Sequence, residues 1–141
     1  MIDHIGFAVA DAERSKLFYE AALAPLGLTL IMTATPEQTQ SGGTAHGFGT
    51  EGNPFFWIGD SEKVGEGTHV AFTAETREQV DAFYEAALAA GGRDHGAPGL
   101  RPHYGPNYYA AFVLDPDGVN IEAVCHASVE DDRAAQLRHR L

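Results

Sequence analysis

The heptapeptide FYEAALA occupies residues 18–24 and recurs, letter for letter, at residues 83–89. The match extends on both sides of the heptapeptide at the same offset of 65 positions. It pairs His4 with His69, Phe7 with Phe72 and Gly27 with Gly92. Internal repeats dictate architecture, and two copies are too few for a solenoid. The sequence therefore predicts a pseudo-symmetric domain made of two similar halves.

Each half begins with an alternating strand that leads into an amphipathic helix. In IDHIGFAV (2–9) and THVAFTA (68–74), bulky residues fall on one face, and the other face carries a histidine followed by small residues. FYEAALA supplies the apolar stripe of each helix, with Asp11 and the pair Thr76 and Gln79 as N-terminal caps. We expect the bulky strand face to pack on the helix and the small face to line an open concavity.

Shorter strands complete each half. The first half offers the runs LTLIMTA, AHGFGT and PFFWIG, and the second offers NYYAAFVL and VNIEAV, joined by the turn DPDG. In the second half a Gly/Pro-rich loop, residues 93–107, stands where a strand is expected. The sequence thus predicts an α+β fold in one domain, with one module over about 1–65 and another over about 66–126. The tail, 127–141, is expected to form a short polar helix.

The composition excludes several classes of function. A formal net charge of −11 argues against nucleic-acid binding, which depends on clustered Lys and Arg. No run approaches the ~20 apolar residues of a membrane span, and the first residues do not resemble a signal peptide. Cys125 is the one cysteine, so no internal disulfide is possible. These features predict a protein of the reducing cytoplasm that binds neither nucleic acid nor membranes.

One glutamate and two histidines suggest a metal site. Glu122 stands in the middle of an apolar strand, where burial is costly unless the carboxylate is paired or bound to something. His4 and His69 occupy equivalent positions on the small-residue faces of the two halves. Two imidazoles and one carboxylate leave coordination positions open on Fe, Mn, Ni or Zn. The competing interpretation is that these histidines only make structural hydrogen bonds.

The motifs DHIGFAV, THVAF and DPDGVNIEAV resemble the vicinal oxygen chelate superfamily. That group contains glyoxalase I, bleomycin-resistance proteins, fosfomycin-resistance enzymes and type I extradiol dioxygenases, and the resemblance covers residues 2–126. It implies βαβββ modules whose mixed sheets curl into a cupped open barrel with the helices outside. It also implies that His4, His69 and Glu122 are the metal ligands.

The resemblance departs from glyoxalase I at one position. Glyoxalase I typically places a second glutamate on the last strand of its first module. Here that strand is PFFWIG, and sliding Gly118 onto Gly52 sets Phe56 against Glu122. The usual fourth ligand is therefore missing, and the remaining set is more similar to the fosfomycin-resistance and extradiol dioxygenase patterns.

Further residues are candidates for catalysis and substrate binding. Candidate general acids or bases are His46, His103 and Tyr104. Candidate substrate-binding residues are Arg101, Tyr108, Tyr109 and Trp57. Arg101 has the geometry to hold a carboxylate or phosphate with two hydrogen bonds, and the aromatic rings suit a flat or apolar group.

Three functional hypotheses follow. The first is a metal-dependent lyase, isomerase, dioxygenase or thiol-transfer enzyme, acting on a small substrate that chelates the metal through two neighbouring oxygens. The second is a metal-free protein that sequesters a drug or metabolite, as bleomycin-resistance proteins do. The third is a regulatory sensor with a structural metal. The family resemblance also implies a homodimer, with a metal site either within one chain or shared between two.

Overall fold

The computed structural model describes all 141 residues, and its first half forms one mixed four-stranded sheet. The chain runs through β1 (Ile5–Ala8), α1 (Ala12–Leu23), the short 3₁₀ helix η1 (Ala24–Leu26), β2 (Thr29–Ala34), β3 (Ala45–Thr50) and β4 (Asn53–Gly59). The strand order is β1-β4-β3-β2, with β1 parallel to β4 and the other pairs antiparallel.

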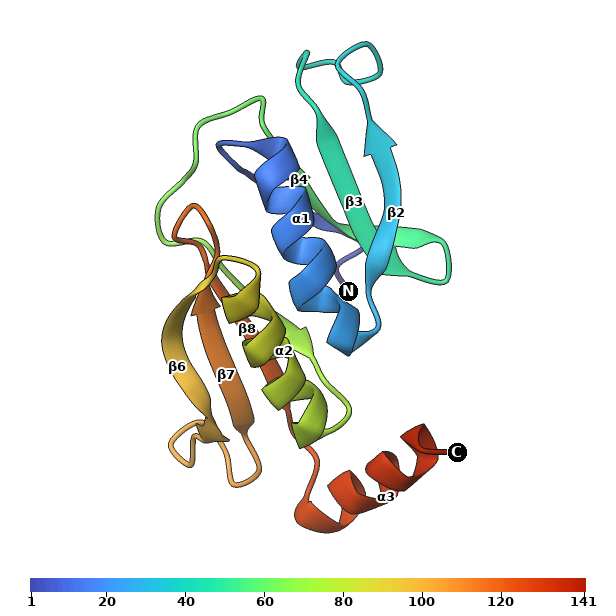
Figure 1. Ribbon diagram of the computed structural model, residues 1–141, viewed down its shortest axis with the longest axis vertical. Helices are drawn as coiled ribbons and strands as arrows, with labels where there is room; N and C mark the ends of the chain where they lie inside the picture. The colour runs from blue at the N-terminus through green and yellow to red at the C-terminus, as the bar shows by residue number, and fades with distance from the viewer.

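The second half repeats this arrangement. It contains β5 (His69–Thr73), α2 (Arg77–Ala89), β6 (Arg93–Leu100), β7 (Tyr109–Leu114) and β8 (Asn120–Cys125), in the order β5-β8-β7-β6. The polar helix α3 (Val129–His139) follows, as expected for the tail. Figure 1 shows the two sheets as separate curled layers that do not close into a barrel. The predicted α+β fold of two repeated βαβββ modules is confirmed.

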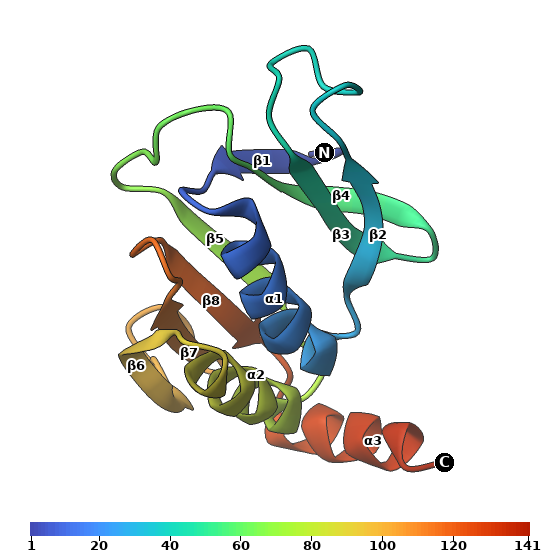
Figure 2. The same ribbon diagram turned by 45° about the horizontal axis from the view of Figure 1, so that its top comes forward.

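Helices α1 and α2 join the two modules. The two views place them side by side (Figures 1 and 2), and a single core of buried apolar residues runs through both modules. Phe18 and Phe83, the first letters of the two heptapeptides, are both fully buried in it. Phe56 of β4 and Phe72 of β5 contact edge to face across the modules, with ring centroids 5.0 Å apart. The repeated heptapeptide is therefore the helix face that packs on the sheets.

The capping residues predicted from the sequence bind the ends of the helices in the structure. The Asp11 carboxylate accepts from the Arg14 N–H at the start of α1, and Thr76 and Gln79 form a capping box at the start of α2. Gly27, at φ 83°, ends the first helical segment in the left-handed conformation that favours glycine.

Residues 93–107 differ from the sequence prediction of a loop. The segment Arg93–Leu100 is strand β6, which pairs antiparallel with β7, and only the residues after it form a loop. The ladder is irregular, with register shifts on both sides of Gly96. β6 lies at the edge of its sheet, where glycines and Pro98 are tolerated because one side of the strand needs no partner. The prediction was wrong because it treated these residues as strand breakers.

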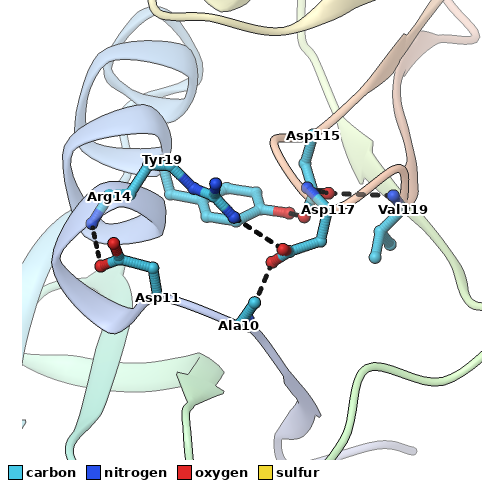
Figure 3. A network of polar contacts seen from close by, with 7 residues as sticks. All are labelled: Ala10, Asp11, Arg14, Tyr19, Asp115, Asp117 and Val119. Carbon is cyan, nitrogen blue, oxygen red and sulfur yellow. Dashed lines mark hydrogen bonds and ion pairs between the residues drawn. The ribbon is translucent and has the colours of Figure 1, made fainter.

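A polar network fastens the second module to α1 (Figure 3). The β7–β8 turn carries Asp115, which is 1% exposed and accepts from the Tyr19 hydroxyl at 2.5 Å. Its other oxygen accepts from the backbone N–H groups of Asp117 and Val119. Asp117 in turn accepts from the Arg14 guanidinium at 2.8 Å and from the Ala10 N–H at 3.1 Å. We call this set the turn–helix latch, and it fixes the two modules of one chain relative to each other.

No helix of the structure combines the length and the apolar character needed to cross a membrane.

Candidate metal centre

Glu122 lies on β8 with its carboxylate on the side of the sheet opposite to the helices. Its strand neighbours Ile121 and Ala123 are fully buried in the core. The parallel register pairs Ala71 with Glu122 and His69 with Asn120, so His69 and Glu122 lie on the same face of adjacent strands. The Glu122 side chain is only 3% exposed, and it lies 3.0 Å from His69, measured from Oε1 to Nε2. The Tyr108 hydroxyl donates to the other carboxylate oxygen.

The hydrogen bonds of His69 define which of its nitrogens carries a proton. Nδ1 lies 3.0 Å from the backbone carbonyl of Asn120, which can only accept, so Nδ1 must carry a hydrogen. In a neutral ring, Nε2 then presents a lone pair to the Glu122 oxygen, and two acceptors 3.0 Å apart repel each other. The contact therefore requires a cation between these atoms, either a proton, carried by the ring or by the carboxyl group, or a metal ion.

The residues present fit a metal ion. Two ligand atoms 3.0 Å apart can both lie about 2.1 Å from one ion, the distance at which His nitrogen and carboxylate oxygen bind zinc and similar metals. A backbone carbonyl on the remote nitrogen is the usual support for a metal-binding histidine. In the same cavity, Oδ1 of Asn120 is buried without a hydrogen-bond partner. His69 and Glu122 therefore fit two of the ligands of a metal site, and the Asn120 carbonyl fits the group that orients the histidine ligand.

His4 lies elsewhere in the chain. It directly precedes β1, its side chain is 62% exposed, and its Nδ1 is 2.7 Å from the Asp3 carboxylate. No three histidine, cysteine, aspartate or glutamate side chains in the chain gather closely enough to hold a metal ion together. In Figure 2 the N-terminus lies beside the first sheet, whereas β5 and β8 belong to the other. Within one chain, the structure brings together His69 and Glu122 but not His4.

A cavity of about 360 Å³ opens beside Glu122. Its walls are His69, Tyr104, Tyr108, Phe112, Asn120 and Glu122. Burial and the Glu122 carboxylate raise the pKa of the Tyr108 hydroxyl to about 12, so this group keeps its proton near neutral pH. The cavity thus combines one carboxylate, one imidazole and a phenol that acts as a hydrogen-bond donor.

The equivalent place in the first module carries no carboxylate. The register pairs Gly6 with Trp57, as Ala71 pairs with Glu122, so Trp57 is the structural counterpart of Glu122. The sequence alignment had set Phe56 there, but Phe56 is fully buried on the helix side. The offset of 65 that relates the first strands also relates Trp57 to Glu122, whereas Gly52 and Gly118 lie 66 positions apart and are therefore not equivalent. Trp57, Gly6 and Ala8 line a cavity of about 460 Å³.

The other predicted site residues divide between the two faces of the sheets. Tyr104 and Tyr108 line the Glu122 cavity, and Arg101 and His103 line a neighbouring one. Tyr109 points the other way, because its hydroxyl donates to Asp81 of α2. His46 also lies on the helix side, with Nδ1 2.9 Å from the Thr33 hydroxyl and Nε2 buried without a partner. Burial, followed by the nearby Lys16, lowers the pKa of His46.

Sequence reasoning missed Phe112 and Asn120 at this site. Phe112 stacks on His69 with ring centroids 6.2 Å apart, and Asn120 supplies the carbonyl that orients the imidazole. Strand alternation places both side chains on the Glu122 face, so the signal was present once the register was known.

Comparison with known proteins identifies the family. The sequence profile of the Glyoxalase/Bleomycin resistance protein/Dioxygenase superfamily matches residues 1–123, and the chain belongs to this superfamily. A glyoxalase/bleomycin resistance protein from Albidiferax ferrireducens T118 is similar, with 30% identity and a TM-score of 0.72 over 90% of this chain and 99% of that one. No curated protein matches the sequence.

Glyoxalase I from Zea mays shares the fold at about twice the length. Its E144Q variant is 26% identical with a TM-score of 0.66, and the match covers 93% of this chain but 47% of the maize chain. A family enzyme from Burkholderia phytofirmans PsJN has 20% identity and a TM-score of 0.64, over 89% of this chain and 98% of that one, which shows the fold alone.

Proposed function

We propose that this protein is a metal-dependent enzyme that acts on a small substrate with two neighbouring oxygens. A bound divalent metal would supply Lewis-acid stabilisation of negative charge that develops on those oxygens. His69 and Glu122 would hold the metal, with the Asn120 carbonyl orienting His69. The protonated Tyr108 hydroxyl fixes the Glu122 carboxylate from the opposite side.

The single observation that carries this proposal is the contact between His69 and Glu122. Its two acceptor atoms, 3.0 Å apart, need a cation between them, and their spacing suits one metal ion. A buried carboxylate without a lysine or arginine partner is costly, which gives the same conclusion from the energetics. Membership of a superfamily that includes glyoxalase I and dioxygenases supports it further.

The third ligand in this proposal is His4 of a second copy of the chain. His4 has the features of a ligand, because Asp3 holds its Nδ1 and leaves Nε2 free on an exposed side chain. Within one chain, the turn–helix latch keeps the first module, and with it His4, in a fixed position away from His69. A homodimer is therefore the assembly that would complete the set of three ligands. Two equivalent sites per dimer follow from twofold symmetry.

The test is metal content by mass spectrometry on protein purified without chelators or an affinity tag. Wild-type protein should carry about one equivalent of Fe, Mn, Ni or Zn per chain, and Glu122→Gln should lose it. Arg133→Gln, on the exposed side of α3, is the matched control and should retain the metal. If the protein binds none of these metals after reconstitution, the enzyme proposal is wrong.

A metal-free binding protein is the second candidate. One observation favours it: both carboxylate oxygens of Glu122 already have protein partners, His69 and Tyr108, so a protonated His69 would satisfy the pair without metal. Under this alternative, Glu122→Gln leaves metal content unchanged at zero and alters only the binding of small molecules.

A further inference from the structure

A second cavity adjoins the candidate metal centre. It measures about 320 Å³ and shares Tyr104, Phe112 and Asn120 with the cavity beside Glu122. Its remaining walls are His95, Gly96, Arg101 and His103, which come from β6 and the loop after it. A ligand whose chelating oxygens lie at Glu122 can therefore extend into this space.

The guanidinium of Arg101 is held in place at this second cavity. Nη1 donates to the Gly99 carbonyl and Nη2 to the Ala97 carbonyl, each at 2.8 Å, and the group lies 5.5 Å above the Phe112 ring. A Cβ at Gly96 or Gly99 would come within 3.2 Å of a guanidinium nitrogen, so the two glycines leave room for the group. Two of the five N–H donors are used, and the others stay available in a fixed orientation.

The charge around Arg101 is unusual for this chain. Although the protein carries 20 acidic residues and a net charge of −11, no acidic residue lines the second cavity. By contrast, the polar cavity at the start of α1 is lined by Asp11, Glu13 and Asp60. The one carboxylate of the adjoining cavity, Glu122, is bound by His69 and Tyr108. An anionic group beside Arg101 therefore meets a cation and no fixed negative charge of the wall.

The walls that the two cavities share are flat. Tyr104 packs against His103 with ring centroids 4.1 Å apart and against Tyr108 at 5.2 Å, and it remains 62% exposed. Phe112 forms the floor between His69 and Arg101. A planar ring or conjugated chain offers faces and edges that aromatic walls bind better than a bulky saturated group.

From these observations we propose that the substrate is a small planar carboxylate, with its carboxylate bound by Arg101 and its chelating oxygens on the metal that His69 and Glu122 would hold. The position of the chelating oxygens rests on the proposed function. The carboxylate end does not, because Arg101 and its cavity exist without a metal.

The test measures benzoate and the neutral benzamide by NMR titration of the chelator-treated full chain. Wild-type protein should bind benzoate at least about tenfold more tightly than benzamide, the discrimination expected of a charge-assisted pair of hydrogen bonds. Arg101→Gln should abolish this preference, Arg101→Lys should keep part of it, and Arg133→Gln should keep all of it. Equal benzoate binding by wild type and Arg101→Gln overturns the proposal, as does no binding of benzoate up to about 10 mM.

A second ligand separates this inference from the proposed function. 3,4-Dihydroxybenzoate carries the same carboxylate and adds two neighbouring oxygens, so Zn²⁺ should tighten its binding while leaving benzoate unchanged. Carboxylate preference without any effect of Zn²⁺, or of Fe²⁺, Mn²⁺ or Ni²⁺ in its place, would disprove the proposed function and leave the Arg101 site intact. Tightening by Zn²⁺ without carboxylate preference would support the proposed function and disprove the Arg101 site.

Discussion

The two copies of FYEAALA have the same sequence but different surroundings. In the first copy Phe18, Tyr19, Ala22 and Leu23 are all fully buried, whereas in the second Tyr84 and Leu88 are only partly buried. Tyr19 differs from Tyr84 because α1 also receives the β7–β8 turn of the other module, where Tyr19 donates to the buried Asp115. The repeated sequence therefore packs each helix on its own sheet in the same way, while contacts between the modules determine how deeply the other side chains are buried and which hydrogen bonds they make.

The same contrast separates the two open faces of the sheets. Glu122 and His69 form a polar pair in the second module, and at the equivalent place the first module has Trp57 beside Gly6. Only the second face therefore has the donors for a metal. In the proposed site the first module would contribute His4, which the fold leaves exposed just before β1.

The largest effects are expected where the two copies agree. Phe18→Ala and Phe83→Ala each remove a fully buried ring and should lower the free energy of unfolding by about 3–5 kcal/mol. Urea unfolding followed by circular dichroism measures both. A difference of several kcal/mol between the two variants would contradict the common core.

Substitution of the two matching tyrosines, Tyr19 and Tyr84, should lower stability by different amounts. Tyr19→Phe leaves the buried Asp115 oxygen without its hydroxyl donor and should cost about 1–3 kcal/mol of unfolding free energy. Tyr84→Phe, at the matching position on α2, should cost less than about 0.5 kcal/mol, as is usual for substitutions away from buried networks. Equal losses in the two variants would contradict a stabilising role specific to the hydrogen bond between Tyr19 and Asp115.

The exposed part of the latch should contribute less. Arg14 is half-exposed where it binds Asp117, so Arg14→Gln should cost about 0.2–1 kcal/mol, and less at high salt. Thermal melts at low and high ionic strength measure this. A loss as large as that of Tyr19→Phe, unchanged by salt, would contradict a screened surface pair.

The smallest effect is a pH dependence confined to the first module. The folded pKa of His46 lies below its usual value of 6.5, so below that pH the unfolded chain binds a proton that the folded chain does not. Wild-type stability should therefore fall, relative to His46→Gln, as pH drops from 7 through 6.5 toward the folded pKa. Unfolding free energies at several pH values test the sign. Parallel curves for the two proteins would show that His46 does not titrate differently on folding.

Much of the fold could be predicted because its signals are local. The heptapeptide, the caps at Asp11 and Thr76, and the alternation around Glu122 each fix structure within a few residues. What escaped prediction depends on contacts between distant segments. Pairing with β7 makes Arg93–Leu100 a strand despite its glycines, and pairing with β1 and β5 makes Trp57, not Phe56, the counterpart of Glu122. The separation of His4 from His69 likewise follows from module packing, which no short motif encodes.

The central claim, a metal site shared between two chains, is tested most directly by complementation. His4→Ala and His69→Ala chains are produced separately and together, and the metal content of each sample is measured. Each variant alone should carry no metal, because both sites of its dimer lack one ligand. Random co-assembly should restore about a quarter of the wild-type metal, since half of the dimers are mixed and each has one complete site. A mixture as empty as the separate variants, despite confirmed mixed dimers, would contradict the shared site.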